Sequence, residues 1–479
     1  MQKKLLAAAV LSAFAGVASA QSANVTLFGT LLGNFEITEA NGADTSAAGG
    51  STSSTRGGTI SAGGFSANAA NQANRTRMNP AGSNFGIRGT EDLGNGLSAW
   101  FHLEFATALG APPPNAGANH GTAPSARNNA VGLRSNTWGT LLLGMWDTPF
   151  NQMNGFLNTN NRTGSASTGF QANLLGATTL GYGAVSGQNA ASWCGALAAG
   201  APGAMNATCF NHGTNFDRRE RGIVQWWSPN WNGFELKASY GTTMDSNAVT
   251  ASNTLSGRSI KPYTWDLAAT YTNGPLGLGV TYAKQKDLLA YSAGLAGGSG
   301  VNGTGTGAWS ITSGAGAGAT YASGSDGRAW RMGGRYSFPM GGGRSLGVGA
   351  MWEQLKWTIN YSGAASVADL TELKKTAYRL QGNFVTGSHF FGLEYTRAND
   401  LKGSIGGTAN NQFNGGGTGA RGYILSYNYM MSKRTSVSLY YTAVDNETNA
   451  NYSGIVFGGI ATAAGANPRY YGAYVRHAF

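Results

Sequence analysis

Sixteen segments in which apolar and polar residues alternate constrain the fold of this 479-residue chain more than any other feature. In the first, Val25, Leu27 and Phe35 share one face, while Thr26 and Asn34 share the other. A strand of about ten residues tilted by 45° climbs roughly 24 Å, close to the 25 Å apolar band of an outer membrane. The segments are 24–38, 83–92, 97–107, 127–136, 139–147, 220–229, 233–241, 263–273, 276–286, 328–338, 345–360, 373–386, 388–398, 420–431, 434–446 and 468–479.

The connections between these segments alternate strictly between short and long. The long ones are 39–82, 108–126, 148–219, 242–262, 287–327, 361–372, 399–419 and 447–467, and tight turns lie between them. This alternation is typical of up-and-down barrels, and an even strand number places both termini at the periplasmic rim. The sequence therefore predicts an all-β, transmembrane, 16-stranded antiparallel up-and-down β-barrel with long extracellular loops and short periplasmic turns.

A soluble β-sandwich or solenoid is the alternative to a membrane barrel. Charged residues make up only 11% of the chain, compared with about 25% in ordinary globular proteins. The apolar faces are rich in aromatic side chains, as in the stretch from Tyr423 to Tyr429, and such residues form the girdles of membrane barrels. The opposite faces are too polar and too rich in glycine to fill the core of a soluble barrel, so a membrane barrel is favoured.

The N-terminus has the pattern of a secretory signal peptide. Lys3 and Lys4 precede an apolar stretch from Leu5 to Val17, and Ala18-Ser19-Ala20 matches a cleavage site. The apolar stretch is too short to span a bilayer as a helix. We therefore predict a signal peptide over 1–20 and a single barrel domain over 21–479. The remaining excess of basic residues indicates the field of a surface or a channel, not a nucleic-acid partner.

Several motifs resemble the Gram-negative general porins of β-proteobacteria. They are the stretch from Asn84 to Leu97, Val131-Gly-Leu133, Trp226-Trp-Ser-Pro-Asn230 with Gly233-Phe234, Met431-Ser-Lys-Arg-Thr435 and Val475-Arg-His-Ala-Phe479. The resemblance implies an outer-membrane homotrimer of water-filled channels for passive diffusion of small hydrophilic solutes and ions. It further implies that the third extracellular loop, 148–219, narrows the lumen. Terminal Phe479 resembles the signal read by the outer-membrane assembly machinery. Membrane lipid and lipopolysaccharide would surround such a barrel.

The strand alternation also predicts which charged residues face the lumen. Rings of Arg or Lys favour anions, whereas rings of acids favour cations. The predicted inward acids are Glu36, Glu104, Glu235, Asp266, Glu353 and Glu394. The candidates for lining or constricting the channel are Asn84, Arg88, Arg134, Arg219, Arg221, Arg331, Arg335 and Arg379. Lys237 also points inward.

Loop 148–219 brings only one carboxylate, Asp217, opposite this basic wall, so we predict a weak anion preference. In the porin family that these motifs resemble, Arg usually occupies the position of Asn84 and often that of Met145. The basic cluster of this chain therefore contains fewer cations. Arg75 and Arg77 could compensate. Alternatively, the inward arginines pair with lumen acids, Arg88 with Asp92 or Glu36 for example.

Cys194 and Cys209 are the only two cysteines, and both lie in loop 148–219. In an oxidising periplasm two such cysteines, with no third to compete, are candidates for a disulfide. The alternative is a pair of free thiols.

Two segments match sequence motifs of enzymes, but neither lies in the structural context that its motif requires. Gly298–Gly303 matches G-x-G-x-x-G without a following helix, and Gly343–Gly347 matches G-x-S-x-G at the start of a strand. The five histidines lack metal-ligand spacing. We therefore predict no catalytic residue, metal or cofactor. Two alternatives remain: a solute-specific porin with a lumen track of Trp100, Trp146 and Trp227, and an outer-membrane enzyme barrel.

Overall fold

The structure, a computed structural model, describes residues 24–42, 60–61, 64–65, 72–79, 82–107, 109, 125–160, 174–175, 216–242, 254–255, 258–259, 263–286, 322–361, 370–405, 416–448, 450, 452 and 465–479. Most of these residues belong to β-strands, and Pro149–Phe156 form the helix α2. The predicted signal peptide, 1–20, lies outside the described residues. The strands are β1 (Asn24–Asn41), β2 (Ile60–Ser61), β3 (Gly64–Phe65), β4 (Gln72–Asn79), β5 (Asn84–Gly94), β6 (Leu97–Ala106), β7 (Ser125–Ser135), β8 (Gly139–Asp147), β9 (Arg219–Trp227), β10 (Phe234–Gly241), β11 (Thr254–Leu255), β12 (Arg258–Ser259), β13 (Tyr263–Asn273), β14 (Leu276–Lys286), β15 (Ala322–Gly341), β16 (Arg344–Tyr361), β17 (Leu370–Thr386), β18 (His389–Ala398), β19 (Lys402–Ile405), β20 (Ala420–Met430), β21 (Thr435–Asn446) and β22 (Asn467–Ala478).

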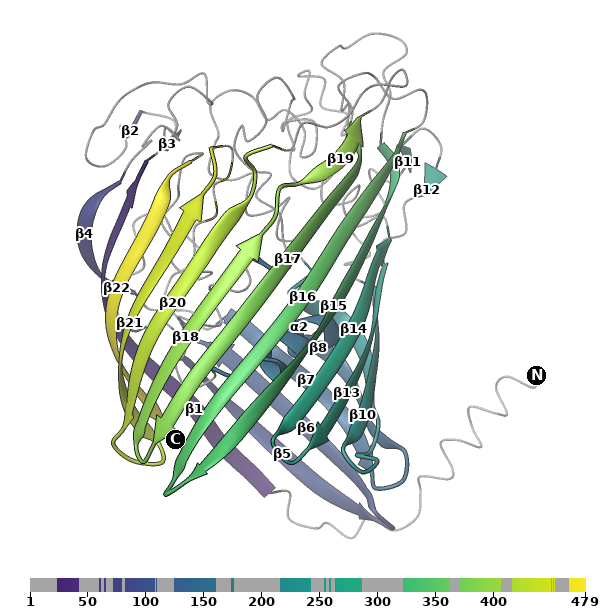
Figure 1. The fold of residues 1–479 in the computed structure, drawn as a ribbon. Helices are drawn as coiled ribbons and strands as arrows, with labels where there is room; N and C mark the ends of the chain where they lie inside the picture. The colour runs from purple at the N-terminus through teal and green to yellow at the C-terminus, as the bar shows by residue number, and fades with distance from the viewer. Residues whose placement is uncertain are drawn as a thin grey trace.

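The main sheet closes on itself as a barrel (Figure 1). Strands that follow one another around the barrel pair antiparallel, and β1 closes the ring by pairing with β22. This last pairing runs from Thr30 opposite Ala478 to Asn41 opposite Asn467. On its other side β1 pairs with β5 and β4. Closure leaves no free edge, which is what a sheet surrounded by lipid requires.

The 18 strand segments of this sheet make 16 barrel strands, as predicted. The segments β4 and β5 both pair with β1 and together form one barrel strand. In the same way β18 and β19 both pair with β17. The fold class is therefore confirmed.

The short connections are tight turns, and two of them have at their centre the Asn-Gly pair that favours a two-residue hairpin. Asn95 and Asn232 are the two non-glycine residues with positive φ among the described residues, both at 52°, and each precedes a glycine with positive φ. In the second turn Trp231 and Phe234 exchange backbone hydrogen bonds of 2.8 and 3.2 Å around Asn232-Gly233. Asn-Gly is the preferred pair for such a two-residue turn because both central residues take positive φ.

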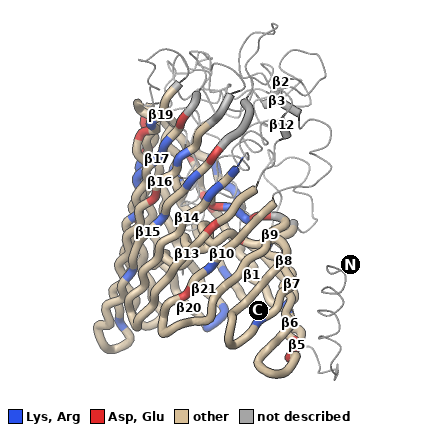
Figure 2. Tube along the Cα trace, turned by 90° about the vertical axis from the view of Figure 1, so that its right-hand side faces the viewer, with Lys and Arg blue, Asp and Glu red and all other residues tan. Residues whose placement is uncertain are grey.

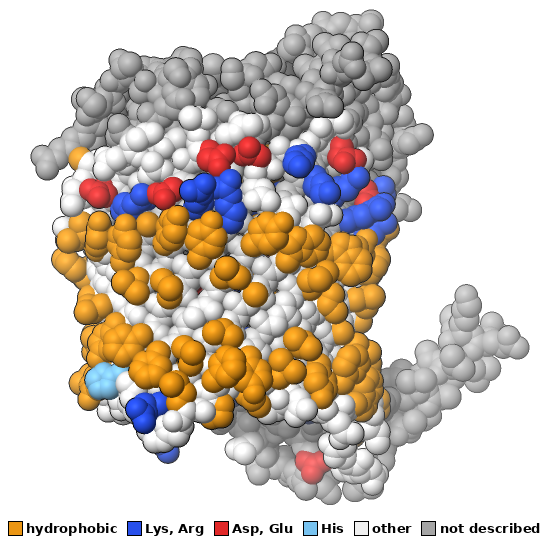
Figure 3. Space-filling model, in the orientation of Figure 1, with side chains coloured by type: hydrophobic (Ala, Val, Ile, Leu, Met, Phe, Trp, Pro, Cys, Tyr) orange, Lys and Arg blue, Asp and Glu red, His pale blue; other side chains and the backbone are white. Residues whose placement is uncertain are grey.

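The apolar side chains point outward, away from the lumen. Val25, Leu27, Leu393 and Leu425 are 58–61% exposed. On the face in Figure 3, apolar side chains form two bands with a paler zone between them, and charged side chains lie beside the band nearer the long connections. Figure 2 likewise shows the charged positions mostly toward that end of the barrel. This is the surface expected of a barrel in a membrane, with aromatic girdles at both interfaces.

Among the described residues, four of the predicted loops contain whole elements of regular structure. Strands β2, β3 and β4 lie within the connection expected over 39–82, helix α2 begins the connection expected over 148–219, β11 and β12 lie within 242–262, and β19 lies within 399–419. The sequence of β4 has no apolar alternation, because Met78 is its only large apolar residue; its strand geometry comes from pairing with β1. Among the described residues, no helix combines the length and apolar composition that crossing a membrane would need.

Candidate functional site

The connection after β8 turns into the barrel and places α2 against the inner wall (Figure 1). The Thr148 side chain caps the helix by accepting a 3.3 Å hydrogen bond from the Asn151 backbone N–H, and Pro149 occupies its first turn. Both are favoured at helix N-termini. The helix contacts β10, β13 and β14. Met153 and Leu157 pack against inward residues of β13, β16 and β17, namely Ala268, Met351 and Ala377.

Glycines in the inner wall leave the space that α2 fills. A side chain at Gly279 of β14 would collide with Met153, and one at Gly333 of β15 would meet Leu157 and the Ala350 carbonyl. The absence of side chains at these two inward positions therefore lets the helix lie directly on the sheet.

Arg331 of β15 fastens both ends of the connection to the wall. Its Nη1 and Nη2 donate to Asp217 at 2.6 and 2.8 Å, its Nε donates to Glu353 at 3.0 Å, and Nη1 also donates to the Phe150 carbonyl at 2.9 Å. The Phe150 ring centroid lies 4.1 Å from the guanidinium carbon. The Arg331 residue is 0% exposed. Burial raises the pKa of the Asp217 carboxyl, and the positive charge of Arg331 opposes that shift.

Further along, polar side chains of β17 and a backbone carbonyl of β18 hold residues 154–160. Arg379 donates to the Asn154 side chain at 3.3 Å, and Gln381 donates to Asn158 at 2.9 Å and accepts from the Thr159 N–H at 3.1 Å. The Asn160 side chain donates to the Leu393 carbonyl at 3.0 Å.

The far end of the described connection reaches the next strands. Lys375 donates to the Leu174 carbonyl, and Leu174 packs with Ala398, Ile424 and Val444 of β18, β20 and β21. We call the inward surface of β13–β18 beneath 148–160, 174–175 and 216–217 the covered wall. The inward surface of β5–β9, opposite the covered wall, is the open wall.

Two of the residues predicted to line the channel, Arg331 and Arg379, lie on the covered wall and are not open to the lumen. Arg331 and Arg379 do face inward, but they are 0% and 1% exposed because the connection lies on them. They therefore hold the loop and do not line open lumen. Strand alternation determines the face of a side chain but not what covers it, so the sequence alone predicts both arginines in the channel lining.

Other predicted residues lie at the edge of the connection or beside it. Arg219 pairs with Asp147 at 3.2 Å and donates to Asn128 at 2.7 Å. Asn84 is half-buried on β5, opposite Thr30. Arg335 lies with its guanidinium carbon 5.1 Å from the Phe156 ring centroid, and its Nε has no hydrogen-bond partner among the described residues. The side chain of Arg221 lies outside the described part of the structure.

The open wall carries exposed cations above aromatic rings. The guanidinium carbon of Arg88 lies 5.2 Å from the Phe28 ring centroid, and that of Arg134 lies 5.8 Å from the Trp100 ring centroid. Both arginines are exposed. Within the described residues, no carboxylate lies within 4 Å of either guanidinium. At the boundary with α2, Lys237 of β10 donates to Gln152 at 2.7 Å and lies over Trp227. These contacts are cation–π pairs, which leave the positive charge available to passing ions.

The inward acids, in contrast, are largely buried. Glu36, Glu104, Asp266, Glu353 and Glu394 are between 0% and 8% exposed. Glu36 pairs with Arg77 at 2.5 Å and accepts from the Tyr440 hydroxyl at 2.6 Å, so it is not the partner of Arg88. Glu104 pairs with Arg127 at 2.5 Å. Glu235 is half-buried near a short turn, where Asn230 donates to it at 3.0 Å.

The three candidate tryptophans do come together on the open wall. Ring centroids are 5.9 Å apart for Trp100 and Trp146, 5.8 Å for Trp146 and Trp227, and 6.4 Å for Trp100 and Trp227. The His102 ring centroid lies 5.2 Å from that of Trp146 and 4.9 Å from that of Phe28. Because Phe28 is on β1, these contacts extend the cluster to that strand. Trp100 is only 7% exposed, so the rings pack chiefly against one another.

The sequence does not predict the amide side chains that anchor the connection. Among the described residues, Asn151, Gln152, Asn154, Asn158 and Asn160 each form a hydrogen bond with a strand of the barrel. Their density within ten residues, directly after a capped helix start, is the signal that could have identified them. Cys194 and Cys209 lie outside the described residues. In the described part of the chain, no three His, Cys, Asp or Glu side chains are grouped so as to hold a metal ion.

Comparisons with known proteins agree with this architecture. A family model described as Gram-negative porin matches residues 7–449. An outer membrane porin protein of Bordetella pertussis is 33% identical over 158 residues, which are 30% of this chain and 33% of that protein, so the match spans about a third of the relative.

Two solved structures share the fold. An anion-selective porin from Comamonas acidovorans superposes with a TM-score of 0.58 at 18% identity, covering 96% of this chain and 100% of that one. The trimer form of OmpT, an outer membrane protein of Vibrio cholerae, gives a TM-score of 0.53 at 12% identity, with 96% and 100% coverage. With a closed barrel and a family match over most of its length, the chain belongs to the Gram-negative porin family and is an outer-membrane protein.

Proposed function

We propose that this porin is a passive channel through which small hydrophilic solutes and ions diffuse, with a weak preference for anions and no need of a cofactor. The family and the closed barrel support a channel. Loop 148–219 would act as the constriction, because its described residues occupy one side of the lumen. No step of such transport requires covalent chemistry, so the family and fold favour a channel over an enzyme.

The observation that carries the anion preference is the unequal exposure of inward charges. Arg88 and Arg134 are exposed, whereas Glu36, Glu353 and Glu394 are 0–1% exposed. Of the exposed charges on the inward face of β5–β7, Arg88 and Arg134 outnumber Asp92, so a solute passing the open wall meets more positive than negative charge, and a positive lumen concentrates anions. A protein with this fold, the Comamonas acidovorans porin, is described as anion-selective.

Liposome swelling and planar bilayers test the proposal together. We expect graded entry of neutral sugars that falls with their size, discrete open-channel currents, and a reversal potential under a KCl gradient whose sign indicates chloride preference. Saturable uptake of a single solute would favour the solute-specific alternative with its aromatic cluster. Tight liposomes without current would contradict the channel.

We infer further that the protein functions as a homotrimer in contact with membrane lipid and lipopolysaccharide, and that the outer-membrane assembly machinery reads Phe479. The backbone of Phe479 pairs with Gly29 through hydrogen bonds of 3.0 and 3.1 Å, and its ring lies over Gly29, which has no side chain to displace it. The terminal residue thus joins the last strand to the first, where the barrel closes. Deleting Phe479 is expected to lower the yield of heat-modifiable trimer on semi-native gels; an unchanged yield would contradict this role.

A further inference from the structure

Trp227 lies between two cations on one line of the strand register. Arg134 of β7 opposes Thr140 of β8, Thr140 opposes Trp227 of β9, and Trp227 opposes Lys237 of β10. The rings of Trp100 and Trp146 pack beside this line. We call Trp100, Trp146, Trp227, Arg134 and Lys237 the tryptophan site.

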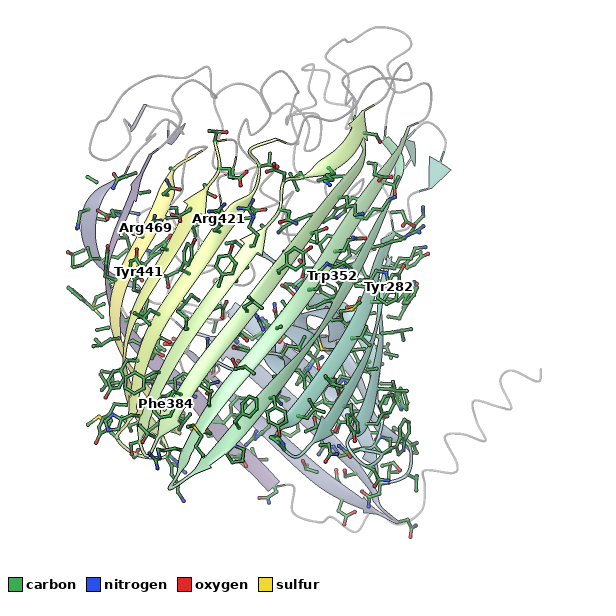
Figure 4. All side chains as sticks on the ribbon, in the orientation of Figure 1. Tyr282, Trp352, Phe384, Arg421, Tyr441 and Arg469 are labelled. Carbon is green, nitrogen blue, oxygen red and sulfur yellow. The ribbon has the colours of Figure 1, made fainter. Side chains whose placement is uncertain are left out.

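The tryptophan site faces the lumen, whereas the aromatic girdles face lipid. Tyr282, labelled in Figure 4, lies on the outward face of β14, because it opposes Trp330, which is 45% exposed. In the tryptophan site, Arg134 is exposed, and Trp146 and Trp227 are half-buried. Solutes in the channel can therefore reach parts of two indole rings and a guanidinium group beside them.

The two cations of the tryptophan site lie beside rings and not beside acids. The guanidinium carbon of Arg134 lies 5.8 Å from the Trp100 ring centroid, and Nζ of Lys237 lies 5.2 Å from that of Trp227. Within the described residues, neither cation has a carboxylate within 4 Å. Glu235, on the same face of β10, accepts a hydrogen bond from an asparagine of the adjacent turn. Both positive charges can therefore attract an anion.

The other end of the open wall is different, because its cations are already paired. Arg127, where β7 begins after a long connection, pairs with Glu104 at 2.5 Å. Arg219, where β9 begins, pairs with Asp147 at 3.2 Å. In the tryptophan site, the buried Trp100 also has an indole N–H without a hydrogen-bond partner among the described residues, although buried indoles usually have one. The site thus combines rings, cations without a carboxylate, and an unused donor.

We propose that the tryptophan site binds aromatic carboxylates, in which a carboxylate is attached to a single ring, on their way through the channel. The solute ring stacks on the open parts of Trp146 and Trp227 in an offset arrangement. Its carboxylate accepts hydrogen bonds from Arg134, whose planar guanidinium can hold both oxygens. A carboxylate attached directly to a ring stays close to that ring, which suits a cation that lies beside indoles.

This inference rests on the proposed channel function and adds a class of solute to it. An aliphatic carboxylate would engage the cations alone, and a neutral arene would engage the rings alone. The tryptophan site therefore distinguishes aromatic carboxylates from other anions of equal charge, which a positive lumen by itself does not do.

The test measures how added solutes reduce the current through single channels in KCl. The probes are benzoate, cyclohexanecarboxylate, which has the charge without the aromatic ring, and benzamide, which has the ring without the charge. Trp227→Leu is compared with Trp330→Leu, which removes an outward indole, and Arg134→Gln with Arg335→Gln, which removes an inward cation of β15. Channel opening in KCl alone shows that each variant has folded, and Arg134 is exposed, so its substitution keeps the test open should Trp227→Leu fail to fold.

We expect benzoate to halve the wild-type current at about a tenfold lower concentration than cyclohexanecarboxylate, because only the aromatic ring stacks on the indoles. Benzamide should have little effect. Trp227→Leu should remove most of this tenfold difference, and Arg134→Gln should weaken the effect of benzoate about fivefold. Trp330→Leu and Arg335→Gln should respond like the wild type.

Equal potency of benzoate and cyclohexanecarboxylate in an open wild-type channel would overturn the tryptophan site and leave the channel function standing. Equal weakening by Arg134→Gln and Arg335→Gln would also overturn it, because it would show that benzoate responds to the field of the whole lumen. A wild type without current in KCl would contradict the channel itself, and this inference with it.

Discussion

The covered and open walls of this barrel use the same residue type for different purposes. Arg331 on the covered wall is fully buried between Asp217 and Glu353, whereas Arg88 and Arg134 on the open wall are exposed above aromatic rings. All three face inward from a β-strand. The difference lies in what the 148–219 connection covers, so an inward arginine is a loop anchor on one side and a source of positive field on the other.

The two walls should therefore respond differently to substitution. Removing one partner of a buried ion pair leaves an uncompensated charge and costs about 3–5 kcal/mol, whereas an exposed charge contributes about 0–1 kcal/mol to stability. We expect changes on the covered wall to alter the loop and the stability of the protein, and changes on the open wall to alter ion preference.

The largest effect is expected for Arg331→Met. Asp217 and Glu353 would lose their shared cation, and the Phe150 carbonyl would lose a donor. We predict a loss of about 3–5 kcal/mol in the free energy of unfolding. We also predict noisy, larger single-channel currents, because the connection would detach from β15.

Arg335→Met is the matched control, since Arg335 lies further along the same inward face without a carboxylate within 4 Å in the described structure. It should leave stability nearly unchanged and the current quiet. If Arg331→Met behaved like this control, Arg331 would not be an anchor.

A smaller effect is expected for Gln381→Ala. Gln381 is 6% exposed and bonds Asn158, the Thr159 N–H and Glu394. Leaving these groups unsatisfied should cost about 1–3 kcal/mol and increase current fluctuations without changing ion preference. Gln354→Ala, on the outward face of the neighbouring strand β16, is the control, and thermal unfolding in detergent is the readout. Equal stability of the two variants would contradict the role assigned to Gln381.

The smallest effect is expected for Lys237→Gln at the boundary between the walls. Lys237 is half-buried, donates to Gln152 and lies over Trp227, so it is less accessible to ions than the exposed Arg88 and Arg134. We predict less than about a twofold change in the chloride-to-potassium permeability ratio, since solvent and salt screen a partly exposed charge. A complete loss of anion preference would show that this boundary, not the open wall, controls the ions.

The strands were predictable because each has to present apolar residues to lipid at every second position. That rule fails for β4, where Gln72–Asn79 gain strand geometry from hydrogen bonding to β1. It also fails for α2, which is too short for a helical period and is held by Met153 and Leu157 packing on the wall.

The candidate site was predictable only in part for a related reason. Alternation correctly turned Arg331, Arg379 and Arg88 inward, but the course of the connection depends on amides such as Asn154 and Asn158 finding partners from strands more than 200 residues away in the sequence. Such pairing arises from the closed barrel and leaves no local pattern. For the same reason the sequence does not show that Asp217, the one carboxylate of this loop, bonds to Arg331.

The reversal potential of Arg88→Gln/Arg134→Gln in a tenfold KCl gradient tests the central claim most directly. Because salt screens each exposed charge, we predict that chloride preference falls roughly two- to threefold per charge removed. The outward-facing Arg421→Gln should match the wild type. A wild type that prefers potassium, or a double variant with an unchanged reversal potential, would contradict the assignment of ion preference to the open wall.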